Sequence, residues 1–150
     1  MNNFNILILS RSFGREYKQP LKILEKNECK ITFTPDLDRP IEEEDLLKLT
    51  SDVDGIIVGA EKITRRVINN ANRLRVISKH GVGVDNIDLD AATKKGIVVT
   101  NVPDANFHAV ADLAFGLMIA VARSICEADR TVRKGLKNML VESYGRKILE

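Results

Sequence analysis

Five short runs of Ile, Leu and Val, spread over the first hundred residues, restrict the fold of this chain more than any other feature. Within each run the apolar residues follow one another without polar alternation, which is typical of strands buried on both faces of a parallel sheet. The runs occupy residues 5–10, 30–34, 55–58, 75–78 and 97–100. We therefore expect five parallel strands.

Helical patterns lie between these runs. Pro20 and Pro40 each stand at a first helical position, and the acidic residues 42–45 would occupy the first turn of the second helix. Apolar residues at helical spacing over 67–74 predict a third helix. A fourth helix is predicted to begin at an Asp88 cap and to end at Gly96. The alternation predicts an α/β fold: a flavodoxin-like parallel five-stranded sheet of order 2-1-3-4-5 with helices on both faces.

The last third of the chain breaks this alternation. Residues 104–134 contain no Pro and a single Gly, which predicts one long helix. Between residues 109 and 122 the helix is apolar on nearly all sides except at Asp112, so a second domain or a second subunit should cover it. We therefore divide the chain into a sheet domain (1–103), a long interdomain or dimerisation helix (104–135) and a connection (136–150).

Charge and composition exclude several classes of protein. The 23 Lys and Arg residues nearly balance the 21 Asp and Glu residues, giving a net charge of +2, which is unlike a strongly electrostatic nucleic-acid binder or a polybasic membrane anchor. The start of the chain has no secretory pattern, and the longest apolar run is too short to span a bilayer. Cys29 and Cys126 are far apart and form no metal-ligand pair. We therefore expect reduced thiols, no metal site and a cytoplasmic protein.

The carboxyl ends of parallel strands meet at one sheet edge, where open α/β folds bind ligands. There Gly81 and Gly83 could let backbone N–H groups approach a small anion, and Asn106 stands at the start of the long helix. Lys79 or Arg11 could supply positive charge. A second interpretation also stays open: the glycines only make a turn, the Asn is a helix cap, and the cations are solvated.

The two histidines do not point to catalysis. Neither His80 nor His108 has a carboxylate partner at helical or strand spacing, so we expect structural roles for both. The sequence G-V-G-V-D-N lacks the third Gly of a dinucleotide-binding fingerprint and does not open directly into a helix, which excludes that function for this loop.

Three motifs in the second half of the chain together resemble one enzyme family. They read R-V-I-S-K-H-G-V-G-V-D-N-I-D at 75–88, A-A-T-K-K-G-I-V-V-T-N-V-P at 91–103, and A-N followed by A-V-A-D within 105–112. They are similar to those of the D-isomer-specific 2-hydroxyacid dehydrogenases, particularly the phosphoglycerate dehydrogenase branch. The elements upstream fit the substrate-binding domain of that family.

The resemblance implies functional positions. It implies that Lys79, Gly81, Val82 and Gly83 contact the substrate carboxylate, with Val82 nearest the nicotinamide of the cofactor NAD, and that Asn106 contacts the substrate. The substrate would be a small 2-hydroxy or 2-oxo acid. The long helix would connect domains and form a homodimer.

The sequence also departs from the family pattern. Gly59, Ala60 and Glu61 stand where phosphoglycerate dehydrogenases often carry an Arg. The family's dinucleotide-binding domain and its Arg, Glu and His catalytic residues belong after these 150 residues. We therefore expect a truncated, substrate-binding portion, leading toward an absent NAD-binding Rossmann domain, with no catalytic residue, no tightly bound NAD and no activity by itself. The alternative is a free-standing, non-catalytic dimeric module that binds a small carboxylate.

Overall fold

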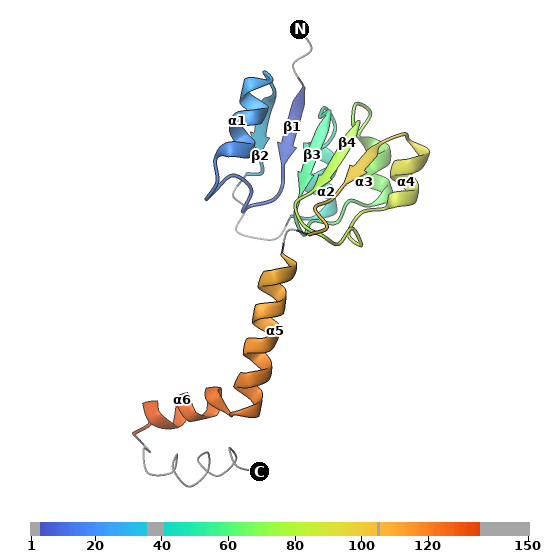
Figure 1. Ribbon diagram of the computed structural model, residues 1–150. Coiled ribbons are helices and arrows are strands. Elements are labelled where there is room, and N and C mark those ends of the chain that lie inside the picture. Colours follow the sequence, from blue (N-terminus) through green and yellow to red (C-terminus); the bar gives the residue numbers. More distant parts are fainter. Residues whose placement is uncertain (1–3, 36–40, 105, 136–150) are drawn as a thin grey trace. The chain divides into compact units, whose positions relative to one another are not determined.

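Five parallel strands form one sheet in the order β2-β1-β3-β4-β5 in the computed structural model, which describes residues 4–35, 41–104 and 106–135 (Figure 1). The strands are β1 (Asn5–Ile8), β2 (Lys30–Phe33), β3 (Gly55–Val58), β4 (Val76–Lys79) and β5 (Val98–Thr100). The predicted fold class, strand count and strand order are confirmed. The chain divides into two units, Met1–Ala105 and Asn106–Glu150, each described by itself below.

The first strand ends earlier than its apolar run suggests. The backbone N–H groups of Leu9 and Ser10 both donate to the carbonyl oxygen of Ile57, at 2.8 and 3.3 Å, so the regular ladder stops after Ile8. Both residues stay buried, which explains why the apolar pattern continues past the strand end. The chain beyond them turns away to form the connection to the first helix.

Four helices connect the strands: α1 (Gln19–Lys26), α2 (Glu43–Leu49), α3 (Arg65–Asn70) and α4 (Leu89–Lys94). The predicted ends of α4 are confirmed, because Asp88 accepts a hydrogen bond from the Ala91 N–H at 2.8 Å and Gly96 has φ +70°. In α2, Glu42 is the N-cap, so only the next three acidic residues lie in the first turn. Pro40, predicted to open that helix, lies outside the described residues.

One face of the sheet carries most of the core. Side chains of β1, β3 and β4 pack there against α2, α3 and α4, whereas α1 contributes no buried residue to it. Since right-handed crossovers place α1 on the opposite face, helices cover both faces as predicted. The largest fully buried core side chains of the strands and helices are Leu7, Ile56, Val58, Leu46, Ile68 and Ile77.

The second unit corrects the prediction of one long helix over 104–134. It contains two helices, α5 (Phe107–Ala122) and α6 (Ile125–Arg133), whose axes differ by 62°. Ser124 lies between them in the left-handed conformation, with φ +49°. Serine favours helix caps over helix interiors, and its carbonyl accepts from the N–H groups of Glu127 and Ala128, so a new helix starts there without Pro or Gly.

The α5 helix is apolar around its circumference and has no buried residue in this unit. Its exposed apolar side chains include Phe107, Val110, Leu113, Phe115, Leu117, Met118, Ile119 and Val121. Within the described part of the chain, no single helix has both the length and the apolar character to cross a membrane. The bent α5–α6 pair meets these two criteria only when both helices are counted together.

Candidate functional site

Two glycines shape the loop that follows β4. Gly81 adopts φ +151°, which side-chain-bearing residues rarely adopt, and a Cβ on Gly83 would lie 2.8 Å from the Asp85 Oδ1 atom. The turn therefore requires a glycine at 81, whereas a Cβ at 83 would require the Asp85 side chain to move. This supports the turn interpretation for these positions without excluding a ligand.

In this loop two backbone carbonyls are hydrogen-bonded, whereas, within the described residues, the backbone N–H groups of residues 81–83 are not. The Gly81 carbonyl accepts from the Val102 N–H at 3.0 Å, and the Val82 carbonyl accepts from the Asn101 side-chain amide at 2.8 Å. The N–H groups of residues 81–83 donate to no acceptor among the described residues. Three successive backbone donors are therefore free, which is the arrangement that binds small anions. The Val82 side chain is 38% exposed beside them.

Lys79 lies at the end of β4 and stabilises the neighbouring loop. Its Nζ donates to the Gly59 carbonyl at 2.6 Å and to the Asn86 Oδ1 atom at 2.8 Å. An ammonium group has three N–H donors, so one remains available to a ligand. The structure thus gives this predicted site residue a positioning role that its place in the sequence did not indicate.

Asn86 is the residue of this site that the sequence analysis missed. Its side-chain amide donates to the backbone carbonyls of Glu61 at 2.6 Å and Gly59 at 3.1 Å. Its backbone carbonyl accepts from the Ile63 N–H at 2.8 Å. Hydrogen bonds of Asn86 therefore join the loop after β3 to the loop after β4. An Asn directly after a glycine-rich turn is a signal for such backbone contacts, because its amide matches peptide groups.

A carboxylate occupies the end of β3. The Oε2 atom of Glu61 accepts from the Gly59 N–H at 2.9 Å, which fixes a negative charge where the family resemblance expects an Arg. A Cβ on Gly59 would lie 3.4 Å from the Ser10 Cα atom, so the loops after β1 and β3 are closely packed. This arrangement disfavours a second anionic group of a ligand next to Glu61.

His80 connects the loops after β1 and β4. Its Nδ1 atom lies 2.7 Å from the Oγ atom of Ser10, which is buried, and its ring meets the Phe13 ring edge-on with centroids 5.5 Å apart. No carboxylate contacts His80 among the described residues. These contacts support the predicted structural role. His108 lies in α5, where its ring stacks on that of Phe107 with centroids 3.8 Å apart.

Asn106 belongs to the second unit, where it is the N-cap residue of α5. Its carbonyl accepts from the Val110 N–H at 2.9 Å, but its side chain makes no capping hydrogen bond. The cap interpretation holds for its backbone, and its side-chain amide is not committed to the helix.

Most of the resolved electrostatic effects lie beside this edge, in the contacts of α2, α3 and α4, whereas the pKa of Arg73 is raised by Asp54 at the opposite end of β3. A hydrogen bond from Thr64 to the Glu43 carboxylate, aided by Arg66, lowers the pKa of Glu43. A backbone hydrogen bond from Ala91 lowers the pKa of Asp88. Glu43 at the start of α2 thus contacts the start of α3. No group of three His, Cys, Asp or Glu side chains suited to a metal ion occurs in the described ranges.

Comparison with known proteins identifies relatives of this arrangement. The family model described as "D-isomer specific 2-hydroxyacid dehydrogenase, catalytic domain" matches residues 6–145. A D-3-phosphoglycerate dehydrogenase of Methanocaldococcus jannaschii is 49% identical over 94 residues, which are 62% of this chain and 18% of that protein. A glyoxylate reductase of Pyrococcus horikoshii is 46% identical over 99 residues, 65% of this chain and 30% of that protein.

Solved structures agree with the sequence matches. The crystal structure of a 3-phosphoglycerate dehydrogenase of Entamoeba histolytica with bound NAD⁺ superimposes with a TM-score of 0.72 at 30% identity. The match covers 81% of this chain and 40% of that one. The chain therefore spans less than half the length of each of these relatives.

Proposed function

Because this chain belongs to the D-isomer-specific 2-hydroxyacid dehydrogenase family, we propose that it is the substrate-binding portion of an oxidoreductase that interconverts 2-hydroxy and 2-oxo acids with NAD. The observation that carries the proposal is the set of three N–H donors without an acceptor among the described residues at residues 81–83, in a loop whose Gly81 and Val82 carbonyls already accept hydrogen bonds. A substrate carboxylate needs such donors and brings the negative charge that they favour.

Each predicted site residue has a separate role in this proposal. The N–H groups of Gly81, Val82 and Gly83 bind the substrate carboxylate, and the remaining donor of Lys79 adds positive charge. Asn106, whose side-chain amide makes no hydrogen bond to its own helix, is assigned to the substrate only by the family resemblance. These residues hold and orient the substrate, which is a proximity effect without proton transfer.

For the cofactor, the chain offers only a partial fit. The exposed Val82 side chain suits the apolar edge of a nicotinamide, but the described loops contain no dinucleotide-binding glycine pattern for the phosphates. When bound, NAD accepts or returns the hydride of the substrate C2 atom. We assign NAD to the complete enzyme, supported by the bound NAD⁺ of the Entamoeba relative, and expect no tight binding or catalysis by these 150 residues.

The domain division supports the same proposal. We assign residues 1–103 to substrate binding, 104–135 to interdomain and dimer contacts, and 136–150 to the connection toward a cofactor domain. The exposed apolar surface of α5 supports a homodimer, and the two free cysteines support a reducing, cytoplasmic setting. The alternative, a free-standing dimeric module that binds a small carboxylate, rests on the same loop and helix.

Amide NMR of the ¹⁵N-labelled chain tests carboxylate binding. Addition of D-lactate or pyruvate should shift the amide signals of residues 81–83, whereas the uncharged lactamide should not. A Gly81→Ala variant should lose this response because of its backbone angle, while Gly116→Ala, a helical glycine with open space around it, should keep it. Equal shifts with lactamide, or none at these residues, would contradict the proposal.

NADH oxidation separates the two candidate functions. The chain by itself should not oxidise NADH with any of a panel of 2-oxo acids, since it lacks an acid–base pair. If adding the separate NAD-binding domain of a family member gives activity, the result supports the proposal that this chain is the substrate-binding portion of an oxidoreductase. If the chain binds the acids but never gains activity, the free-standing module is favoured.

A further inference from the structure

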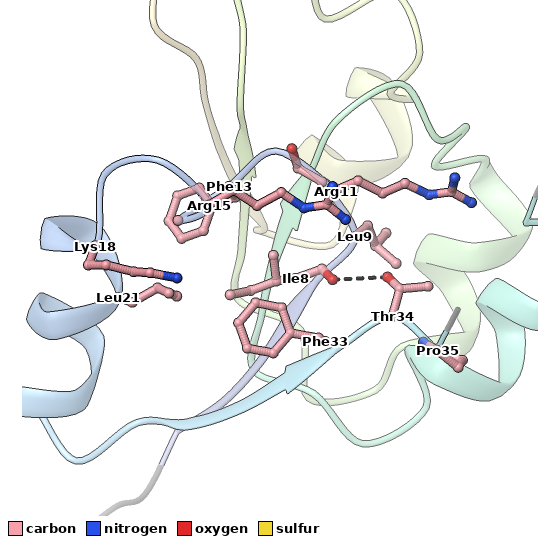
Figure 2. A pocket seen from close by; sticks show the side chains of 12 residues that line it. Ile8, Leu9, Arg11, Phe13, Arg15, Lys18, Leu21, Phe33, Thr34 and Pro35 are labelled. Carbon is pink, nitrogen blue, oxygen red and sulfur yellow. Dashed lines mark hydrogen bonds between the residues drawn. The ribbon is translucent and has the colours of Figure 1, made fainter. Parts of the chain in front are cut away.

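A cavity at the same sheet edge lies over β1 and β2, whereas the residue 81–83 loop follows β4. It has a volume of about 240 Å³ and is formed by the ends of β1 and β2, the β1–α1 connection and the start of α1 (Figure 2). Apolar side chains form much of its lining, and the exposed Phe33 is one of them. The apolar lining residues are Ile8, Leu9, Phe13, Leu21, Phe33 and Pro35.

Cationic side chains stand over this apolar surface, and no acidic residue is among the described residues that line the cavity. In Figure 2 the Lys18 side chain points from the start of α1 toward Ile8 and Phe33, and the Arg15 side chain crosses above them. Arg11 extends toward the opposite side. Figure 2 thus shows two cations directed at the cavity and a third at its margin.

These cations differ from the other arginines that the structure describes in the first unit. Arg65, Arg66 and Arg73 each form an ion pair with a carboxylate, and Arg75 lies over the Phe4 ring. The side chains of Arg11, Arg15 and Lys18 form no ion pair or hydrogen bond with any described residue. Their charge is therefore available to an anion.

The β1–α1 connection below these cations packs closely against α1. Gly14 has φ +71°, and a Cβ there would lie 2.5 Å from the Leu21 Cδ1 atom, so the connection is packed directly against α1. The Thr34 hydroxyl donates to the Ile8 carbonyl at 2.9 Å and can then offer a ligand only acceptor capacity. The side-chain donors of Arg15 and Lys18 must therefore supply the polar recognition.

We propose that this cavity binds a small carboxylate with a compact apolar body, the carboxylate on Arg15 and Lys18 and the body against Phe33 and Ile8. The volume is below the roughly 300 Å³ at which pockets begin to hold drug-sized ligands, which restricts the body to a few carbon atoms. Adjacent strands are about 4.8 Å apart and β3 separates β1 from β4, so a ligand on Phe33 and Ile8 lies over other strands than the residue 81–83 loop. The two sites are neighbours, because His80 contacts Ser10 and Phe13 of the cavity lining. Binding in this cavity goes beyond the proposed function and does not depend on it.

Titration of the ¹⁵N-labelled chain with 4-methylpentanoate tests the site. The amide signals of residues 14–18 and 33–34 should shift with a Kd of about 1 mM. Uncharged 4-methylpentanamide, lacking the charge, and acetate, lacking the body, should each bind about tenfold more weakly. Because the residue 81–83 amides are observed in the same spectra, failure at one site is distinguished from failure at the other.

Variants identify the groups responsible. R15Q/K18Q should weaken 4-methylpentanoate binding about tenfold, whereas K22Q/K26Q, which removes two exposed α1 charges outside the cavity, should leave it unchanged. Phe33→Ala should weaken 4-methylpentanoate binding but not acetate binding. Equal affinity in R15Q/K18Q and in the unchanged chain, or shifts confined to residues 81–83, would overturn the proposal.

Discussion

Single residues at the carboxyl edge of the sheet serve backbone geometry before they serve a ligand. Gly14, Gly81 and Gly83 each occupy a position where a Cβ would clash or where φ is unfavourable for other residues. Asn86 supplies the amide that joins two loops. The glycines allow the turns at this edge, and Asn86 bonds the carbonyls of Gly59 and Glu61. The N–H groups of residues 81–83 have no acceptor among the described residues.

Gly14→Ala should destabilise the first unit by about 2 kcal/mol or more, since the new methyl group meets Leu21 and the backbone angle is unfavourable. Urea unfolding measures the change. The control Gly116→Ala adds a methyl group in open space on a helix and should stabilise α5 by about 0.5–1 kcal/mol. Equal stability of Gly14→Ala and the unchanged chain would show that the turn relaxes.

Asn86→Ala should cost about 1–3 kcal/mol, because the half-buried Glu61 carbonyl loses its side-chain donor, the Gly59 carbonyl keeps only Lys79, and Lys79 loses an acceptor. The residue 81–83 amides should also shift without any ligand. Asn72→Ala is the matched control, since Asn72 is exposed and makes no hydrogen bond within the described ranges. Equal unfolding midpoints of the two variants would argue against the loop-tying role.

At the scale of elements, polar contacts between helices add a pH dependence to the fold. Glu43 at the start of α2 accepts from Thr64 and pairs with Arg66, both at the start of α3. These contacts lower the pKa of Glu43 below its value in the unfolded chain. Its contribution to stability is therefore fully present above the unfolded pKa and is lost as pH falls through the folded pKa.

Glu43→Gln should accordingly lower the unfolding midpoint near pH 7 and reduce its dependence on pH below about 4.5, the unfolded value. Urea titrations at a series of pH values measure both effects. Glu25→Gln, an exposed position in α1 without an ion pair among the described residues, serves as the control and should follow the unchanged chain. A steeper acid dependence in Glu43→Gln would reverse the assigned sign.

At the scale of the whole molecule, the described residues leave two apolar surfaces without cover. The α5 helix exposes Leu113, Leu117 and Val121, each at more than half of its full area, and β5 exposes Val98 at the edge of the sheet. Surfaces of this kind mark contacts with other protein. They fit a chain that spans 18–30% of its curated relatives.

The α5 surface leads to a prediction about assembly. The chain should form a dimer, and Leu117→Glu should shift it toward the monomer by placing a charge in the apolar contact. Ile23→Glu, at an exposed apolar position on α1, should leave the dimer intact. Light scattering at micromolar concentration measures the mass, and a monomer before any substitution would contradict the dimer.

Much of this fold and part of the site follow from the sequence alone. The apolar runs determined five strands and their parallel order, because strands buried on both faces need continuous Ile, Leu and Val and right-handed crossovers. Local chemistry determined the Asp88 cap, the Gly96 stop and the glycine turn after β4, since each depends on neighbours in the chain.

The tertiary structure alone decided what depends on residues distant in sequence. It brought Lys79 and Asn86 to Gly59, joined Ser10 to His80, and left Arg15 and Lys18 unpaired over an apolar cavity. The break at Ser124 was also missed, because helix continuity was inferred from the absence of Pro and Gly. The spacing of apolar residues predicts which face of an element is buried. The hydrogen-bond partner of a polar side chain depends on how distant parts of the chain pack together.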